Sequence, residues 1–179
     1  MVVLLQSNFS FSQENNLVVF FRDAITDSIP IYSSETSTDY IAKIKEDPEL
    51  ENWHDVEILK VSNNRYKVHI MPLNVANVVP IDGWVDKEQC GVWLRAWHQE
   101  GELFIVRLYS EPGKSFPFLK LFDKMPDDFG KYTNEEAAPV LDYKYYKGDY
   151  WIKTVIIKDK HKVIGWTRDF CPNVYDSCN

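Results

Sequence analysis

Hydrophobic and polar residues alternate along two stretches of the chain, around positions 65–70 and 150–157. An alternation with a period of two puts every second side chain on one face of a β-strand. The runs that precede these stretches, 56–61 and 140–146, are also strand-like in composition. The pattern therefore predicts two β-hairpins. The positions expected to share a face are Tyr66, Val68 and Ile70 in the first hairpin and Ile152, Thr154 and Ile156 in the second.

Each predicted hairpin has turn-forming residues at its tip. Asn63-Asn64 separates the first pair of strands, and Lys147-Gly148-Asp149 separates the second. Hairpin turns of two residues need positive φ angles, which asparagine, aspartate and glycine tolerate best. We therefore expect left-handed backbone at Asn-Asn and at Gly-Asp.

The chain also repeats a series of short motifs in the same order. Each copy contains a Leu/Ile-Tyr-Ser step, a strand-like run, an acidic connection with a proline, one of the hairpins, a Gly-Trp pair and then a cysteine. Self-similarity of this kind indicates two copies of one structural unit. The matched motifs are Ile31-Tyr32-Ser33 with Leu108-Tyr109-Ser110, 41–44 with 118–121, Gly83-Trp84 with Gly165-Trp166, and 18–22 with 92–95.

The repeat predicts two tandem modules, 14–89 and 90–179, that meet near Cys90-Gly91. No linker rich in Pro, Gly or Ser separates them. Where one module ends the next strand begins, so we expect a fixed angle between the modules.

The repeated motifs resemble those of the bacterial Src-homology-3-like domain. The second copy carries LYSEPG at 108–113, GDYWIK at 148–153 and IGWTRDFC at 164–171, and the first copy carries IYSSET at 31–36, NNRYKV at 63–68 and DGWVDKEQC at 82–90. The ending CPNVYDSC at 171–178 is similar to the cysteine-bracketed tail of some exported members in the Bacteroidetes. The resemblance covers nearly everything after the first dozen residues.

This resemblance implies an all-β protein made of two tandem, small, five-stranded Src-homology-3-like barrels. It also implies a binding role, because such modules accompany cell-wall hydrolases and recognise wall peptides or protein partners; a fold alone does not fix a function. The first copy departs from the pattern. Arg65 stands where the second copy has Trp151, and the longer loop at 71–82 precedes its Gly-Trp pair.

Charge and hydropathy exclude several classes of partner. The formal net charge is −7 and the isoelectric point is about 5.1. Binding to nucleic acid or to an anionic lipid surface requires clustered basic residues, and none are visible. No stretch approaches the roughly 18 to 20 apolar residues that span a bilayer. We therefore expect neither nucleic-acid binding nor membrane insertion.

The N-terminus suggests export. Residues 1–13 combine a short apolar run with the small residues Ser10 and Ser12 at −3 and −1 of a cut before Gln13, as at the end of a signal peptide. The alternative is an N-terminal β-strand. In an oxidising compartment Cys171 and Cys178 would form a disulfide that closes the tail, and Cys90 would remain a free, buried thiol. An extracytoplasmic location, periplasmic or secreted, is the expectation.

The candidate binding residues are four side chains of the second copy. The neighbours of Ile152, Thr154 and Ile156 point outward, so Trp151 is expected on the outer surface, and Lys153 beside it. Tyr109 and Trp166 would complete a shallow aromatic groove that binds an extended peptide by stacking. The alternative is that Tyr109 and Trp166 belong to the core or to the interface between modules.

Motifs for catalysis are absent from the sequence. It contains no nucleophile elbow, no zinc-protease motif and no glycine-rich phosphate loop, and its four histidines share no motif with its cysteines. We therefore expect no catalytic residues, no cofactor and no metal site. The acidic pairs Asp127-Asp128 and Glu135-Glu136 lack the spacing of a calcium loop.

Together these features predict a non-enzymatic, extracytoplasmic binding or scaffold protein that recognises a peptide-like cell-wall ligand or an exported protein. Two alternatives stay open. One is an inhibitor or immunity-type protein that blocks another exported protein with an acidic loop, and the other is a cell-wall hydrolase.

Overall fold

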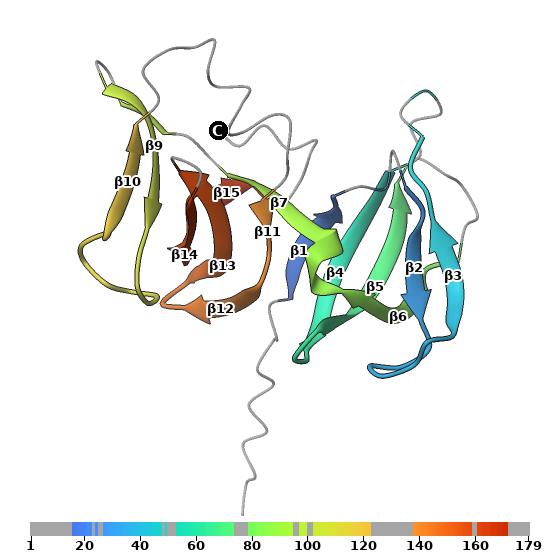
Figure 1. The fold of residues 1–179 in the computed structure, drawn as a ribbon. Coiled ribbons are helices and arrows are strands. Elements are labelled where there is room, and N and C mark those ends of the chain that lie inside the picture. The colour runs from blue at the N-terminus through green and yellow to red at the C-terminus, as the bar shows by residue number, and fades with distance from the viewer. Residues whose placement is uncertain are drawn as a thin grey trace, which may run out of the picture.

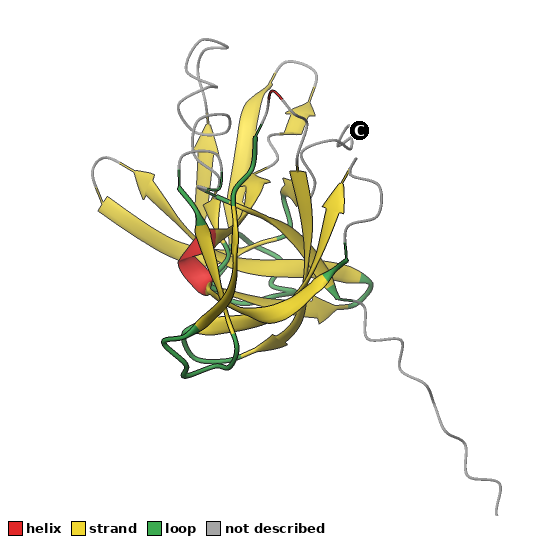
Figure 2. Ribbon diagram, turned by 90° about the vertical axis from the view of Figure 1, so that its right-hand side faces the viewer, coloured by secondary structure: helices red, strands yellow, loops and turns green. Residues whose placement is uncertain are grey.

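The computed structural model describes residues 16–22, 24, 27–47, 49, 53–73, 79–94, 97–99, 102–122, 138–158 and 161–171. Their regular structure consists of antiparallel strands and the short 3-10 helix η2 (Lys87–Gln89), with no α-helix among these residues (Figures 1 and 2). The predicted all-β class is therefore confirmed. No helix in this part of the chain is long and apolar enough to cross a membrane.

Six strands of the first half pair in the order β1-β4-β5-β6-β2-β3. At the centre, the hairpin of β4 and β5 pairs Ile58 with Val68 and Val56 with Ile70. Val68, Ile70 and Tyr66 are fully buried, so the predicted alternation is confirmed. The strands are β1 (Leu17–Phe21), β2 (Ile29–Tyr32), β3 (Tyr40–Ile44), β4 (Trp53–Val61), β5 (Arg65–Leu73) and β6 (Ile81–Asp86).

The second half contains two three-stranded sheets, β10-β9-β8 and β12-β13-β14. On β13 the alternating Ile152, Thr154 and Ile156 are buried, as predicted. The strands are β7 (Cys90–Leu94), β8 (Trp97–Gln99), β9 (Glu102–Leu108), β10 (Leu119–Phe122), β11 (Ala138–Pro139), β12 (Asp142–Tyr146), β13 (Asp149–Lys158), β14 (His161–Thr167) and β15 (Phe170–Cys171).

Strand pairings of the first half recur in the second half. The series β4-β5-β6 corresponds to β12-β13-β14, and the hairpin of β2 and β3 corresponds to that of β9 and β10. The repeated Tyr and Trp are cross-strand partners in both halves: Tyr32 lies opposite Trp84, and Tyr109 lies opposite Trp166. The sequence repeat therefore corresponds to a repeat of strand pairings.

The glycine of each Gly-Trp pair allows two strands to approach closely. A Cβ atom at Gly165 would lie 2.9 Å from the Cβ of Leu108, and one at Gly83 would collide with the side chain of Ile31. Ile31 and Leu108 are the residues that precede the repeated Tyr-Ser step. A side chain at either glycine would force the crossing strand away, which explains why both copies need glycine here.

Strand β7 belongs to both halves. Its first two residues, Cys90 and Gly91, pair with Phe21 and Phe20 of β1, whereas residues 91–94 pair with β11 and β15. Figure 1 accordingly shows β7 and β11 between the blue-green strands of the first half and the yellow-to-red strands of the second. The predicted boundary at residue 90 therefore coincides with the start of a shared strand. Within the described residues the pairings do not close into barrels.

One buried cluster extends through both halves, from Leu17 on β1 to Ile156 on β13. Hydrogen bonds join the halves at its edge. The Tyr66 hydroxyl donates to the Val140 carbonyl at 2.9 Å, and the Tyr150 hydroxyl donates to the Asn16 carbonyl at 3.0 Å. The halves therefore share a core and are not independent surfaces in loose contact.

The hairpin turns differ from the expectation. Positive φ occurs at Lys147 and Gly148, one residue earlier than Gly-Asp, because Asp149 already pairs within β13. The Asn63-Asn64 turn does not adopt positive φ. Ser62 stabilises it instead, since its hydroxyl donates to the Arg65 carbonyl and accepts from the Arg65 N–H.

Three predictions concern the chain ends and the cysteines. Cys90 is free and fully buried, as expected. The signal-peptide segment, 1–13, and Cys178 lie outside the described residues, so the export signal and the Cys171–Cys178 bond stay predictions. Cys171 itself is buried on β15, opposite Trp93.

Candidate binding site

The structure brings three of the four predicted binding residues into contact. Tyr109, Trp151 and Trp166 form a cluster of their own, separate from the main core. Trp151 and Lys153 lie on the outer face of β13, opposite to the face that carries Ile152, and Lys153 is the cross-strand partner of Trp166. The predicted face is therefore right, and we name this set of three rings the aromatic cluster.

The prediction that Trp151 is exposed is wrong, because only 4% of it is accessible. The Tyr109 ring meets it edge to face, with centroids 5.2 Å apart, and the Arg168 guanidinium lies 5.7 Å above it. An outward direction says which face a side chain occupies and nothing about what covers that face. Here an aromatic neighbour and a long cationic side chain cover it.

Tyr109 and Trp166 are also buried. Two backbone hydrogen bonds join these residues. The Tyr109 N–H donates to the Trp166 carbonyl at 2.7 Å, and the Trp166 N–H donates to the Tyr109 carbonyl at 2.8 Å. The Lys144 ammonium lies 5.2 Å from the centre of the Trp166 ring. Each indole is therefore packed beside a cation whose side chain is exposed, and the ring electrons attract that cation.

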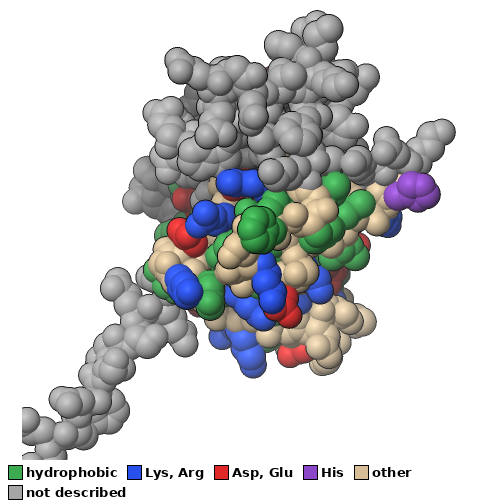
Figure 3. All heavy atoms as spheres, turned by 90° about the vertical axis from the view of Figure 1, so that its left-hand side faces the viewer, with side chains coloured by type: hydrophobic (Ala, Val, Ile, Leu, Met, Phe, Trp, Pro, Cys, Tyr) green, Lys and Arg blue, Asp and Glu red, His purple; other side chains and the backbone are tan. Residues whose placement is uncertain are grey.

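Exposed apolar side chains surround the aromatic cluster. Tyr146 follows Lys144 by two residues on β12, and Ile164 precedes Trp166 by two residues on β14. Each therefore lies on the same face of the sheet as the aromatic cluster, and both are exposed. The loop after Tyr109 carries Phe116, which is 87% exposed. Figure 3 shows the molecule from the side of β9 and β10 in Figure 1, and apolar side chains lie there among Lys and Arg. Apolar and cationic groups on one face suit a ligand with both apolar and anionic parts.

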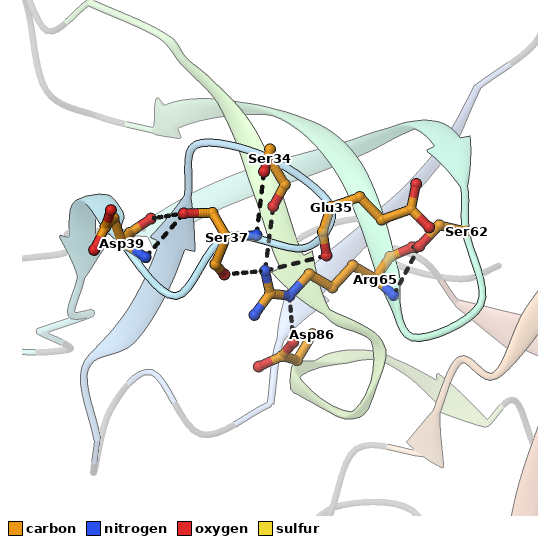
Figure 4. A network of polar contacts seen from close by, with 7 residues as sticks. All are labelled: Ser34, Glu35, Ser37, Asp39, Ser62, Arg65 and Asp86. Atoms are coloured by element: carbon orange, nitrogen blue, oxygen red, sulfur yellow. Dashed lines mark hydrogen bonds and ion pairs between the residues drawn. The ribbon is translucent and has the colours of Figure 1, made fainter.

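The first half has an equivalent cluster of different chemistry (Figure 4). The Arg65 guanidinium stacks 3.5 Å from the centre of the Tyr32 ring and pairs with Asp86 at 2.8 Å. Its Nη1 also donates to the carbonyls of Ser34, Glu35 and Ser37. Arg65 thus holds the 33–37 loop over the tyrosine, at the position where the second copy has Trp151.

Lys153 does not contact the aromatic rings through its ammonium group; it lines a pocket between the halves. This junction pocket has a volume of about 450 Å³. The first half contributes Val61, Ser62, Asn63 and Lys87, and the second contributes Leu141, Asp142, Lys153 and Ile164. Sequence reasoning missed Lys87 and Asp142, because they are far apart along the chain and only the packing of the two halves brings them to one pocket.

The reactive side chains of Cys90 and His69 lie outside the aromatic cluster. Burial raises the pKa of the Cys90 thiol far above its ordinary value, and the nearby Asp86 raises it further. That shift disfavours the thiolate that nucleophilic catalysis requires. His69 is hydrogen-bonded to Asp82 at 2.6 Å on an exposed face. Among the residues described, no three His, Cys, Asp or Glu side chains lie close enough to hold a metal ion.

No protein-family model matches the chain, and neither a curated protein nor a solved structure is significantly similar to it. The physical arrangement of the two halves is therefore the basis for assigning a function.

Proposed function

We propose that this chain is a non-enzymatic binding protein that recognises a peptide-like cell-wall ligand on the outer face of β12-β13-β14. The observation that carries the proposal is the pair of tryptophans on that face, away from the shared core. Lys144 and Arg168, whose side chains are exposed, lie over these rings. Tryptophan is enriched in binding surfaces, and the long cationic side chains over these rings can reach an anionic group of a ligand.

The rim of the aromatic cluster supports the same proposal. Tyr146 and Ile164 are exposed on this face, and Phe116 lies in the adjacent loop. An extended peptide could place apolar side chains on these groups while its backbone polar groups face the cations.

We propose further that each half is one Src-homology-3-like module. The recurring strand pairings, the equivalent Tyr-Trp pairs and the equivalent glycines support this. The extracytoplasmic location rests on residues 1–13 and on the Cys171–Cys178 pair, as argued from the sequence. The acidic connection that would serve an inhibitor lies at 123–137, outside the described residues.

A sedimentation assay with protein-free cell-wall polymer tests the proposal. The wild-type chain should sediment with the polymer. Tyr146→Asp should weaken retention by about tenfold or more, because it puts a charge into the rim of the contact surface and the loss of a binding anchor costs about 2 kcal/mol. Tyr40→Asp is the matched control, because Tyr40 is an exposed tyrosine on β3 of the first half.

Three results would contradict the proposal. The wild-type chain could stay in the supernatant, the two variants could lose retention equally, or the chain could release soluble fragments from the polymer. The last result would indicate a hydrolase.

A further inference from the structure

The junction pocket is separate from the aromatic cluster and is built by both halves. Its floor and walls come from the β4–β5 turn, from η2, from the segment before β12, and from β13 and β14. Its volume of about 450 Å³ falls within the range of small-ligand sites, about 300–1,000 Å³. It exists only when the halves are packed together, and the Tyr66–Val140 hydrogen bond helps to fix that packing.

Two lysines, Lys87 and Lys153, line this pocket together with one carboxylate, that of Asp142. Within the described part of the chain, neither Lys87 nor Lys153 forms an ion pair. The Lys87 ammonium donates to the Leu141 carbonyl at 3.2 Å and lies 5.0 Å from the Tyr66 ring centre, so donors remain for a ligand. Desolvation by burial lowers its pKa, and the nearby Asp142 opposes that shift.

The third charged group of the pocket is Asp142. It is the cross-strand partner of Lys153, and one of its oxygens accepts a hydrogen bond from the Tyr143 N–H at 2.9 Å. Its second oxygen can accept from a ligand. The pocket therefore combines two cations with one acceptor, next to the apolar side chains of Val61, Leu141 and Ile164.

We propose that the junction pocket binds an α-carboxylate with a neighbouring nitrogen donor, as found at the C-terminal residue of a peptide or in a free amino acid. Lys87 and Lys153 hold the carboxylate, and Asp142 accepts from the amide or ammonium nitrogen. The apolar side chains contact a small aliphatic side chain. This inference shares Lys153 and Ile164 with the proposed binding face, but it does not need the aromatic cluster, to which none of its charged groups belongs.

Calorimetric titration of the full chain with the dipeptide Ala-Ala, its C-terminal amide and free alanine tests the assignment. Ala-Ala should bind, and the amide should bind about ten- to a hundredfold more weakly, because it lacks the charge that the lysines recognise. Binding of alanine equal to that of Ala-Ala would identify the free amino acid as the source, and much weaker binding of alanine would identify the peptide terminus. No heat with Ala-Ala at millimolar concentration, or equal binding of acid and amide, would overturn the proposal.

Variants locate the site. Lys153→Met and Lys87→Met should each weaken Ala-Ala binding by about ten- to a hundredfold. Lys67→Met is the matched control, because Lys67 lies opposite Trp84 as Lys153 lies opposite Trp166. Lys87→Met also removes a hydrogen bond, so Lys153→Met and shifts of the backbone amide signals of Asp142 and Lys153 on titration give independent readouts. Equal weakening by Lys67→Met would contradict the site. Loss of wall-polymer retention in Tyr146→Asp with intact Ala-Ala binding would separate the two proposals.

Discussion

The two halves place the same row of residues on their outer faces, but a different side chain packs against the row in each half. In the first half Tyr32, Trp84 and Lys67 lie side by side across three strands, and in the second half Tyr109, Trp166 and Lys153 do the same. What packs against the tyrosine differs. It is the guanidinium of Arg65 in one half and the indole of Trp151 in the other.

This difference shows how one backbone frame can serve two purposes. Arg65 has four polar partners and ties down a loop, so the first half uses the position for its own structure. Trp151 contacts a ring and lies beneath Arg168, which is exposed and pairs with the exposed Asp149. The second half thus keeps an aromatic cluster beneath an exposed arginine. We propose that this arginine is a movable cover, and we expect ligand binding there.

The largest expected effect follows from removing the indole of Trp151. Trp151→Ala should lower the free energy of unfolding by about 3–5 kcal/mol, because the ring is buried in a cluster with Tyr109 and Trp166 and its loss leaves a cavity. Urea denaturation measures this, with Tyr66→Ala as a core reference of similar size. A change within about 0.5 kcal/mol would instead indicate an exposed ring.

Arg65→Met tests the structural role of the arginine that packs against Tyr32 in the first half. It keeps the stacking volume over Tyr32 and removes the bonds to Asp86 and to three carbonyls, so we expect a loss of about 2–3 kcal/mol. The 33–37 loop should also become sensitive to protease, since it loses its anchor. Unchanged amide exchange in that loop would show that Arg65 does not hold it.

Replacing the glycine at the strand crossing should destabilise the protein to a similar extent in both halves. Gly83→Ala and Gly165→Ala each introduce a Cβ into space occupied by Ile31 or Leu108, and overpacking of this kind costs about 1–3 kcal/mol. Thermal denaturation of the two variants measures the effect. Gly148→Ala is a control for added volume, because nothing lies near its Cβ position; its positive φ adds strain of a different origin. A large loss at one position and none at the other would break the equivalence.

Much of this fold could be predicted from the sequence because it depends on local patterns. The period of two identified the buried faces of β5 and β13, and the repeated motifs identified the equivalent Tyr-Trp pairs. The cover over Trp151 was not predictable in the same way. Arg168 follows Trp166 by two residues and so shares its face, but only the strand register places it above Trp151. The junction pocket depends on how the halves pack, and no motif links Lys87 with Lys153.

The shared core itself can be tested through Tyr66. Tyr66→Phe should cost about 1–2 kcal/mol, because the buried Val140 carbonyl loses its donor across the two halves. Burial raises the pKa of the Tyr66 phenol well above its usual value, with smaller contributions from Cys90, Asp142 and Tyr143. The unfolded chain therefore releases this proton first, and the stability of the wild type falls as the pH rises above about 10. The fall should be smaller in Tyr66→Phe, and Tyr40→Phe, at an exposed position, is the matched control for the loss of a hydroxyl group.

Arg168→Ala is expected to have the smallest effect on stability. It is also the most direct test of whether this arginine is a movable cover. Arg168 is exposed and pairs with an exposed Asp149, and such pairs and cation–ring contacts contribute about 0.2–1 kcal/mol each. The denaturation midpoint should therefore change little, while the Trp151 ring gains access to solvent. Quenching of tryptophan fluorescence by acrylamide measures that access, and it should increase in Arg168→Ala. Lys60→Ala is the matched control, because Lys60 lies 5.9 Å from the Trp84 ring in the first half. A large loss of stability in Arg168→Ala, or no gain in quenching, would show that the arginine is a fixed part of the structure and not a cover.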